Sequence, residues 1–80
     1  MRFDLLLAGL HLFKSRSQAQ AAIEEGHALL NGARVKPSHT ARAGDRVTLV
    51  SEHGERTLEV LDLPRRSMSK QAARELVRES

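Results

Sequence analysis

Residues 15–36 read SRSQAQAAIEEGHALLNGARVK, and the spacing of the apolar side chains changes in the middle of this stretch. The first half has the spacing of one helical face, carried by Ala19, Ala22 and Ile23. This spacing predicts a helix over 16–25 that begins at a Ser15 cap and ends at Gly26. Ser17 offers a competing cap two residues later.

The second half of the stretch has the pattern of strands. Residues 28–30 are apolar and lead into Asn31-Gly32, a strong signal for a two-residue hairpin turn. A return strand is expected over 34–36, and it should end at Pro37, which cannot donate to a strand ladder. The stretch therefore predicts a helix followed by a β-hairpin.

A first helix is expected before this stretch, over residues 3–13. Its apolar face consists of Phe3, Leu6, Leu7, Leu10 and the position of Phe13 or Lys14. Asp4 lies in the first turn, where a negative charge suits the helix dipole. Only Lys14 and Ser15 would separate the two helices, so the pattern predicts a tight helical hairpin.

Beyond the stretch, alternating patterns predict strands over 46–50 and 56–61, joined by a hairpin tip at 52–55. A final helix is expected after Ser67 or Ser69, with an apolar stripe of Ala72, Ala73, Leu76 and Val77. Two helices, then three to five short antiparallel strands, then a short C-terminal helix make an α+β fold. We expect one domain over 1–80, with a core at 1–63 and a helical extension at 64–80.

The charge is unevenly distributed along the 80 residues. The formal net charge is +3, and the whole excess lies in residues 1–51. A basic face suggests a polyanionic partner, although ordinary solubilising charge would look the same. Phe3 and Phe13 are the only aromatic residues, so there is no platform on which RNA bases could stack. Any RNA would be recognised through its backbone and shape.

Several other classes of protein are not supported. There is no cysteine for a disulfide or a thiolate metal site, and the spacings of the four histidines match no common metal-ligand pair. No catalytic serine motif and no phosphate-binding glycine loop occurs. No apolar run reaches the roughly 20 residues of a membrane span. We expect a monomeric, cytoplasmic protein that is not an enzyme and needs no cofactor or metal.

Three groups of polar and basic residues are candidates for contact with nucleic acid. The first surrounds the start of the second helix, where free backbone amides favour phosphate, and comprises Lys14, Ser15, Arg16, Ser17 and Gln18. The second, Arg34 and Lys36, alternates with Val35 and is expected on the solvated face of the sheet. The third follows Pro37 and comprises His39, Arg42 and Arg46. Asn31 and Gly32 could also approach a ligand, although a turn-forming role is the commoner one.

Four motifs occur in order along the chain: Arg2-Phe3-Asp4, Phe13-Lys14-Ser15-Arg16-Ser17, Asn31-Gly32-Ala33-Arg34-Val35-Lys36-Pro37-Ser38 and Gly44-Asp45-Arg46-Val47. Together they resemble the S-four RNA-binding domain, which is named after a small-subunit ribosomal protein. The similarity continues through 55–60 and the Arg65-Arg66 pair. Within that superfamily the chain is most similar to the ribosome-associated heat-shock proteins, although it has His11 where they usually carry arginine.

The resemblance implies the alpha-L RNA-binding motif, a helical hairpin packed on a small curved antiparallel sheet. It implies that structured RNA, either ribosomal or transfer RNA, is bound along the helices and the first hairpin. The RNA-contacting positions that it implies are Arg2, Lys14, Ser15, Arg16, Ser17, Arg34, Lys36, Pro37 and His39. For the heat-shock relatives it also implies a ribosomal partner, a large subunit blocked by a tRNA-linked nascent chain.

Two other functions remain open at the level of the sequence. The two-helix unit could act as a DNA-binding helix-turn-helix, but its second helix is rich in alanine and ends in Glu24-Glu25, a poor surface for a major groove. Alternatively, the chain could be a protein–protein adaptor that docks through Leu5, Leu12 and its terminal helix. Binding to duplex DNA, or a complex that survives ribonuclease, would favour these alternatives respectively.

Overall fold

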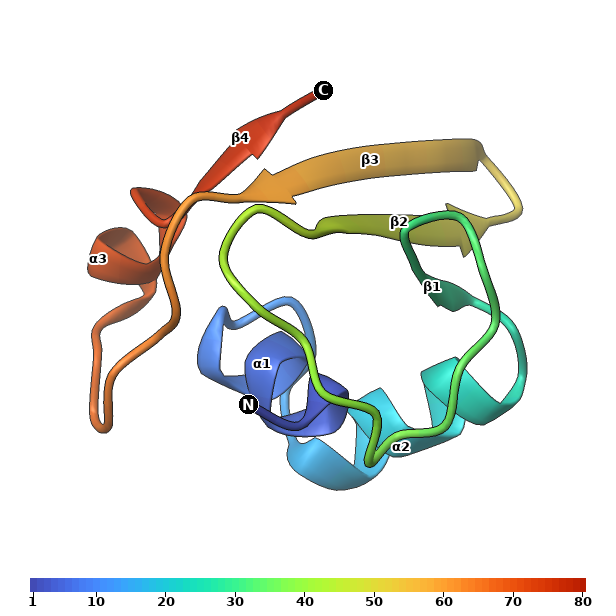
Figure 1. Ribbon diagram of the computed structural model, residues 1–80, viewed down its shortest axis with the longest axis horizontal. Helices are drawn as coiled ribbons and strands as arrows, with labels where there is room; N and C mark the ends of the chain where they lie inside the picture. Colours follow the sequence, from blue (N-terminus) through green and yellow to red (C-terminus); the bar gives the residue numbers. More distant parts are fainter.

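Two N-terminal helices lie against one face of a four-stranded antiparallel sheet in the computed structural model, which describes residues 1–80 (Figure 1). The strand order is β1-β2-β3-β4, and the class is α+β as the sequence predicts. The elements are α1 Phe3–Gly9, α2 Arg16–Glu24, β1 Ala28–Leu30, β2 Arg46–Ser51, β3 Gly54–Val60, α3 Lys70–Arg74 and β4 Val77–Glu79.

Helix α1 ends at Gly9, four residues earlier than the apolar spacing predicts. The backbone turns at His11, which has a positive φ of 58°. The Leu12 N–H then donates to the Leu7 carbonyl at 3.1 Å, the six-to-one bond of a Schellman motif. This termination lengthens the link between the helices from the expected two residues to residues 10–15.

Helix α2 forms where it is predicted. The Ser15 hydroxyl accepts a hydrogen bond from the Gln18 N–H at 3.2 Å, so Ser15 is the N-cap and the competing Ser17 start is not used. Gly26 ends the helix with a φ of 80°, and the His27 N–H bonds the Ala22 carbonyl at 2.8 Å. Both N-terminal helices therefore end in the same motif, one with glycine and one with histidine in the left-handed conformation.

The Asn31-Gly32 turn forms as predicted, but the return strand over 34–36 does not. Both turn residues have positive φ, and Leu30 and Ala33 exchange a pair of backbone hydrogen bonds. Strand β1 then pairs with β2 instead, with Leu30 opposite Val47. The longer β2 offers β1 a full set of partners, and the chain after Ala33 leaves the sheet.

Residues 37–41 run beside the start of the chain, which explains why they are not in the sheet. The first N–H groups of a helix have no partner within the helix. Here the Phe3 N–H donates to the His39 carbonyl at 2.8 Å and the Asp4 N–H to the Pro37 carbonyl at 3.1 Å. Met1 and Ala41 exchange backbone hydrogen bonds as well. The segment that was expected to follow a strand therefore caps α1.

The C-terminal region contains a strand that the sequence pattern did not predict. Helix α3 begins at the Ser69 N-cap, one of the two expected starts, but it ends at Arg74. Val77 was expected to continue the helix, and instead it opens β4 opposite Val60. The free edge of β3 supplies hydrogen-bond partners that a longer helix would leave unused, so tertiary pairing overrides the helical spacing.

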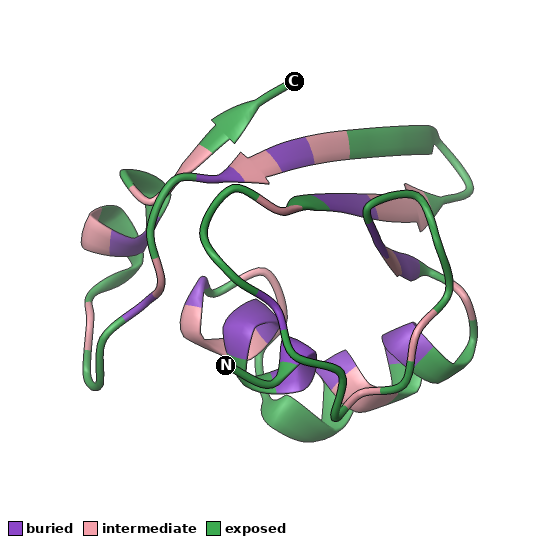
Figure 2. Ribbon diagram, viewed as in Figure 1, coloured by how far each residue is buried: buried purple, intermediate pink, exposed green.

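The core lies between the two N-terminal helices and the sheet, as the buried positions in Figure 2 show. Its members are Phe3, Leu6, Leu7, Leu10, Ala19, Ala22, Ile23, Ala28, Leu30, Ala41, Val47 and Val60. The segment before α3 packs closely on α1 at Gly9. A side chain would not fit there, since a Cβ added to Gly9 would lie only 2.7 Å from Pro64 Cγ. None of the helices has the length and apolarity needed to cross a membrane.

Candidate nucleic-acid interface

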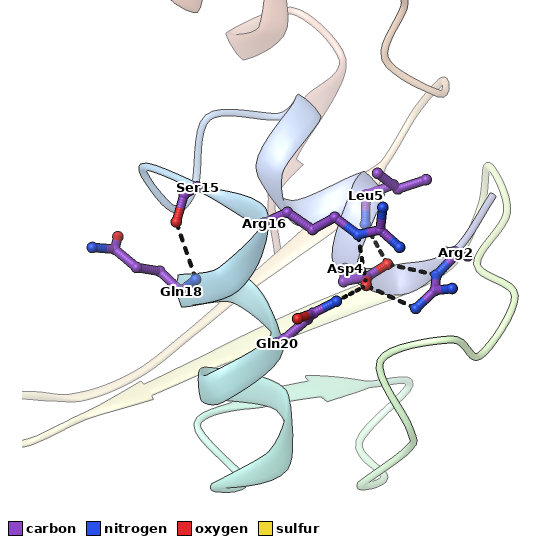
Figure 3. Close-up of polar contacts among 7 residues, drawn as sticks. All are labelled: Arg2, Asp4, Leu5, Ser15, Arg16, Gln18 and Gln20. Atoms are coloured by element: carbon purple, nitrogen blue, oxygen red, sulfur yellow. Dashed lines mark hydrogen bonds and ion pairs between the residues drawn. The ribbon is translucent and has the colours of Figure 1, made fainter.

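Asp4 is a fully buried carboxylate at the junction of the two N-terminal helices. It accepts hydrogen bonds from three side chains that belong to different parts of the chain (Figure 3). Arg2 donates through two nitrogens at 3.1 Å each, Arg16 through Nε at 3.1 Å and Gln20 through Nε2 at 2.8 Å. The N–H of Leu5 adds a fifth hydrogen bond at 2.8 Å. We call these four side chains, Asp4, Arg2, Arg16 and Gln20, the Asp4 cluster.

The electrostatics of the cluster keep Asp4 ionised. Burial alone would raise the pKa of the Asp4 carboxyl, but the hydrogen bonds from Arg2, Gln20, Arg16 and the Leu5 N–H outweigh burial and hold that pKa well below its usual range. The two arginine side chains remain 43% and 45% exposed. One negative charge thus fixes two guanidinium groups at the surface, and the cluster retains a net charge of about +1.

The positions of these side chains follow from the helical hairpin. Asp4 lies in the first turn of α1, and Arg16 is the first residue of α2. Gln20 lies four residues after Arg16, so both face α1 from the same side of α2. Arg2 is held by the isolated bridge to Thr40 in the segment that caps α1. The hairpin and the capping segment together orient both cations.

The structure places the remaining residues of the first candidate group at the start of α2. Lys14 is exposed and its side chain has no partner within the protein; its N–H donates to Gln18 Oε1 at 3.3 Å. The Ser15 hydroxyl is used as the helix cap, whereas Ser17 is exposed on the first turn. Lys14 and Arg16 are therefore the cations that flank the free amides of α2.

The second candidate group, Arg34 and Lys36, is not on the solvated face of the sheet, because the strand that would have placed it there does not form. Arg34 lies at the other end of α2, where its Nη2 donates to the Glu24 carbonyl at 2.6 Å. There it satisfies a free carbonyl of the helix terminus and covers Gly26. Lys36 is exposed without a side-chain partner, just before the half-buried Pro37.

The third candidate group is divided by the structure. His39 is exposed in the segment that caps α1, and its carbonyl bonds Phe3. Arg42 and Arg46 lie on either side of Asp45 in the chain. The Asp45 carboxylate accepts from the Arg42 N–H at 2.9 Å and from the Asn31 side chain at 3.2 Å. The Asn31 carbonyl oxygen accepts from the Arg46 N–H at 2.9 Å, so Asn31 serves the turn itself.

Asp4 and Gln20 are the two members of the cluster that the sequence pattern did not identify. Asp4 was interpreted only as a favourable charge near the helix dipole. One signal was available: Asp4 lies three residues before Leu7, on the side of the predicted helix that is otherwise apolar. An ionised carboxylate on a buried face needs charged or hydrogen-bonding partners, and the arginines of the neighbouring motifs provide them.

The molecule is an α+β domain in which a helical hairpin with fixed cations packs on an open antiparallel sheet. The sequence profile of the S4 domain matches residues 1–47, and the chain belongs to the S4 domain family. The fold and this membership indicate an RNA-binding protein, and both are typical of proteins that do not catalyse a reaction.

A solved structure shares the complete fold. It is described as a trimeric structure of Heat Shock Protein 15 from Vibrio cholerae, and it superimposes with a TM-score of 0.91 at 31% sequence identity. The similarity covers 100% of this chain and 81% of that chain. No curated protein sequence matches the chain significantly. The expected likeness to heat-shock proteins of this type is confirmed by the structural comparison.

Proposed function

We propose that this protein binds structured ribosomal or transfer RNA, without catalysis, through the surface formed by the Asp4 cluster, the start of α2 and residues 34–42. The observation that carries the proposal is that the single Asp4 carboxylate pairs with both Arg2 and Arg16. It fixes the two guanidinium groups and leaves both accessible to solvent. A guanidinium group whose position is fixed in advance binds a phosphate with less loss of side-chain entropy.

The other residues of the interface have graded roles in this proposal. Lys14, Lys36 and Arg42 have side-chain cations without partners in the protein, and they follow the phosphate backbone. Arg34 divides its contacts between the Glu24 carbonyl and RNA. Ser15, Ser17 and Gln18 present the amide end of α2, and Pro37 and His39 shape the adjoining segment. A surface of this kind recognises the path of the backbone and not the bases, because the two aromatic side chains, Phe3 and Phe13, pack on the core.

The proposed partner is a ribosomal subunit in the cytoplasm, and the proposed role is the rescue or recycling of stalled large subunits. The proposed partner and role are supported by the likeness to Heat Shock Protein 15 and by the complete coverage of the chain in that comparison. We further propose that the protein acts as a monomer.

The test is fluorescence-anisotropy binding to a folded tRNA or ribosomal RNA fragment and to a matched DNA duplex over a salt series. We expect RNA to be preferred, with a log–log salt slope of about −3 to −5 from four to six phosphate contacts. The Lys14→Ala/Arg16→Ala variant should bind more weakly and with a flatter slope. Lys14→Ala alone is the matched variant that breaks no contact inside the protein. The proposal would be contradicted if the protein bound RNA and DNA with equal affinity and neither variant changed that affinity.

The oligomeric state is tested by sedimentation velocity at concentrations around those of the binding assay. A monomer is expected because the large exposed apolar side chains are only Met1, Leu5 and Leu61. Met1 and Leu5 line one hollow beside α1, and this small set does not make a large apolar patch. A stable trimer would contradict this expectation and would make this chain resemble the Vibrio cholerae structure in assembly as well as in fold.

A further inference from the structure

A second group of basic side chains lies beside the link between α1 and α2. These side chains line an open hollow of about 560 Å³, bounded by that link, by strands β3 and β4 and by α3. Figure 1 shows α3 beside the sheet, displaced from the two N-terminal helices. The hollow shares no lining residue with the Asp4 cluster. We call it the α3 hollow.

The floor of the α3 hollow is apolar. Leu58 is fully buried beneath it, and Leu12 and Val77 line it as half-buried side chains. The volume lies within the range of about 300–1,000 Å³ that is usual for small-molecule sites. A floor of this size and composition suits a flat, weakly polar ring.

The rim of the hollow carries an excess of positive charge. Arg56 is paired with Glu79, so these two charges cancel. Lys70 and Arg74 also line the hollow, and neither side chain has a hydrogen bond or an ion pair. They lie four residues apart on α3, and therefore on one face of it, where two like charges repel each other. An anion between them would relieve this repulsion.

The hollow is close along the chain to the proposed RNA surface. Leu12 lines the hollow, and Lys14 lies two residues later at the start of α2. Two residues of chain separate Cα atoms by at most about 7 Å. Lys14 therefore lies close to one lining residue of the hollow, and a phosphate backbone that contacts Lys14 has a short path across the link towards it.

We infer that the α3 hollow binds an unpaired nucleotide of the RNA, with the base on the apolar floor and the adjoining phosphates at Lys70 and Arg74. The inference rests on the proposed RNA-binding function and adds a ligand class to it. RNA offers such nucleotides in bulges and loops, where bases can be displaced from the stack. The hollow makes the protein selective for RNA helices that contain an unpaired nucleotide.

The experiment measures the affinity of the full chain for three RNA hairpins: one fully paired, one with a single bulged nucleotide and one with an abasic residue at the bulge. Wild type should bind the bulged hairpin about tenfold more tightly than the paired and abasic ones. The Lys70→Ala/Arg74→Ala variant should lose this preference and keep its affinity for the paired hairpin. Alanine favours helix, so α3 should still form.

The matched control is Arg65→Ala/Arg66→Ala, which removes the same charge from residues outside the hollow and should keep the preference. If wild type binds all three hairpins equally, or if the Lys70→Ala/Arg74→Ala variant keeps the preference, the hollow is not the site, although the proposed function stands. If the abasic hairpin binds as well as the bulged one, the floor does not hold a base and the inference is wrong. If wild type binds no RNA, both proposals are wrong.

Discussion

Asp4 is the residue on which the fold and the proposed RNA surface both depend. Its carboxylate is buried and accepts from three side chains and one backbone N–H. Replacement of Asp4 by asparagine keeps the shape but removes the charge and one acceptor oxygen. We expect the free energy of unfolding at pH 7 to fall by about 2–3 kcal/mol, measured by urea denaturation. A change below about 0.5 kcal/mol would contradict the role assigned to the cluster.

The same carboxylate predicts how stability depends on pH. The pKa of Asp4 is lowered in the folded protein, so its contribution is fully present above the unfolded pKa of about 3.9 and is lost as the pH falls below that value. Urea denaturation of wild type and Asp4→Asn at pH 7, 5, 3.5 and 2.5 should show a constant gap between pH 7 and 5 that narrows in acid. Other carboxylates affect both proteins alike. A gap independent of pH would show that Asp4 is not stabilised as an anion.

For single residues, the sequence predicted the positions of the cations better than it predicted the side chains that pair with them. Lys14 and Arg16 are exposed at the start of α2 as expected, because a cap and its neighbours are local features. Asp4 lies in the first turn of α1 as predicted, but its burial among side-chain partners was not predicted, because two of these partners lie 12 and 16 positions away along the chain. The roles of all these residues in binding RNA stay predictions.

The two helix ends allow a direct comparison at the scale of elements. His11 has the left-handed conformation that glycine adopts without strain, while its ring contacts the Met68 carbonyl at 3.0 Å. Because that contact is exposed, the relief of strain should dominate. We expect His11→Gly to raise the free energy of unfolding by about 0.5–1 kcal/mol in thermal or urea denaturation.

Gly26→Ala is the matched substitution at the equivalent position of α2. There the new side chain meets both a positive φ of 80° and the Arg34 guanidinium, 3.2 Å away. We expect the free energy of unfolding to fall by about 1 kcal/mol, and by more if Arg34 is displaced from the Glu24 carbonyl.

For the His11→Gly variant, a fall in the free energy of unfolding would contradict the prediction. It would mean that the Met68 contact matters more than the backbone strain.

Local signals explain which elements could be predicted. Helix α2 and the Asn31-Gly32 turn are specified by their own caps and turn residues, and both were predicted correctly. Whether 34–36 returned to the sheet depended on the competing strand β2, and whether Val77 stayed helical depended on the free edge of β3. Neither competitor lies within the segment concerned, so periodicity could not reveal the outcome.

For the whole molecule, the division of the chain at residue 63 remains a prediction that truncation can test. All members of the main core cluster lie at or before Val60, and later residues such as Leu76 and Val77 pack on its edge. We expect a chain of residues 1–63 to fold with the same helices, but with a free energy of unfolding lower by about 2–4 kcal/mol. Circular dichroism and urea denaturation measure both quantities. A chain without cooperative unfolding would show that β4 and α3 are indispensable.

The hydrogen bonds between Met1 and Ala41 join groups 40 positions apart, and this separation determines when the RNA surface can exist. Protein synthesis proceeds from the N-terminus, and a seven-residue helix such as α1 is too short to persist alone. Its first donors have no partner until the segment around Pro37 has left the ribosome. The paired arginines at Asp4 should therefore assemble late. A partly synthesised chain would already carry Arg2 and Arg16, but it would lack the arrangement through which we propose that they bind RNA.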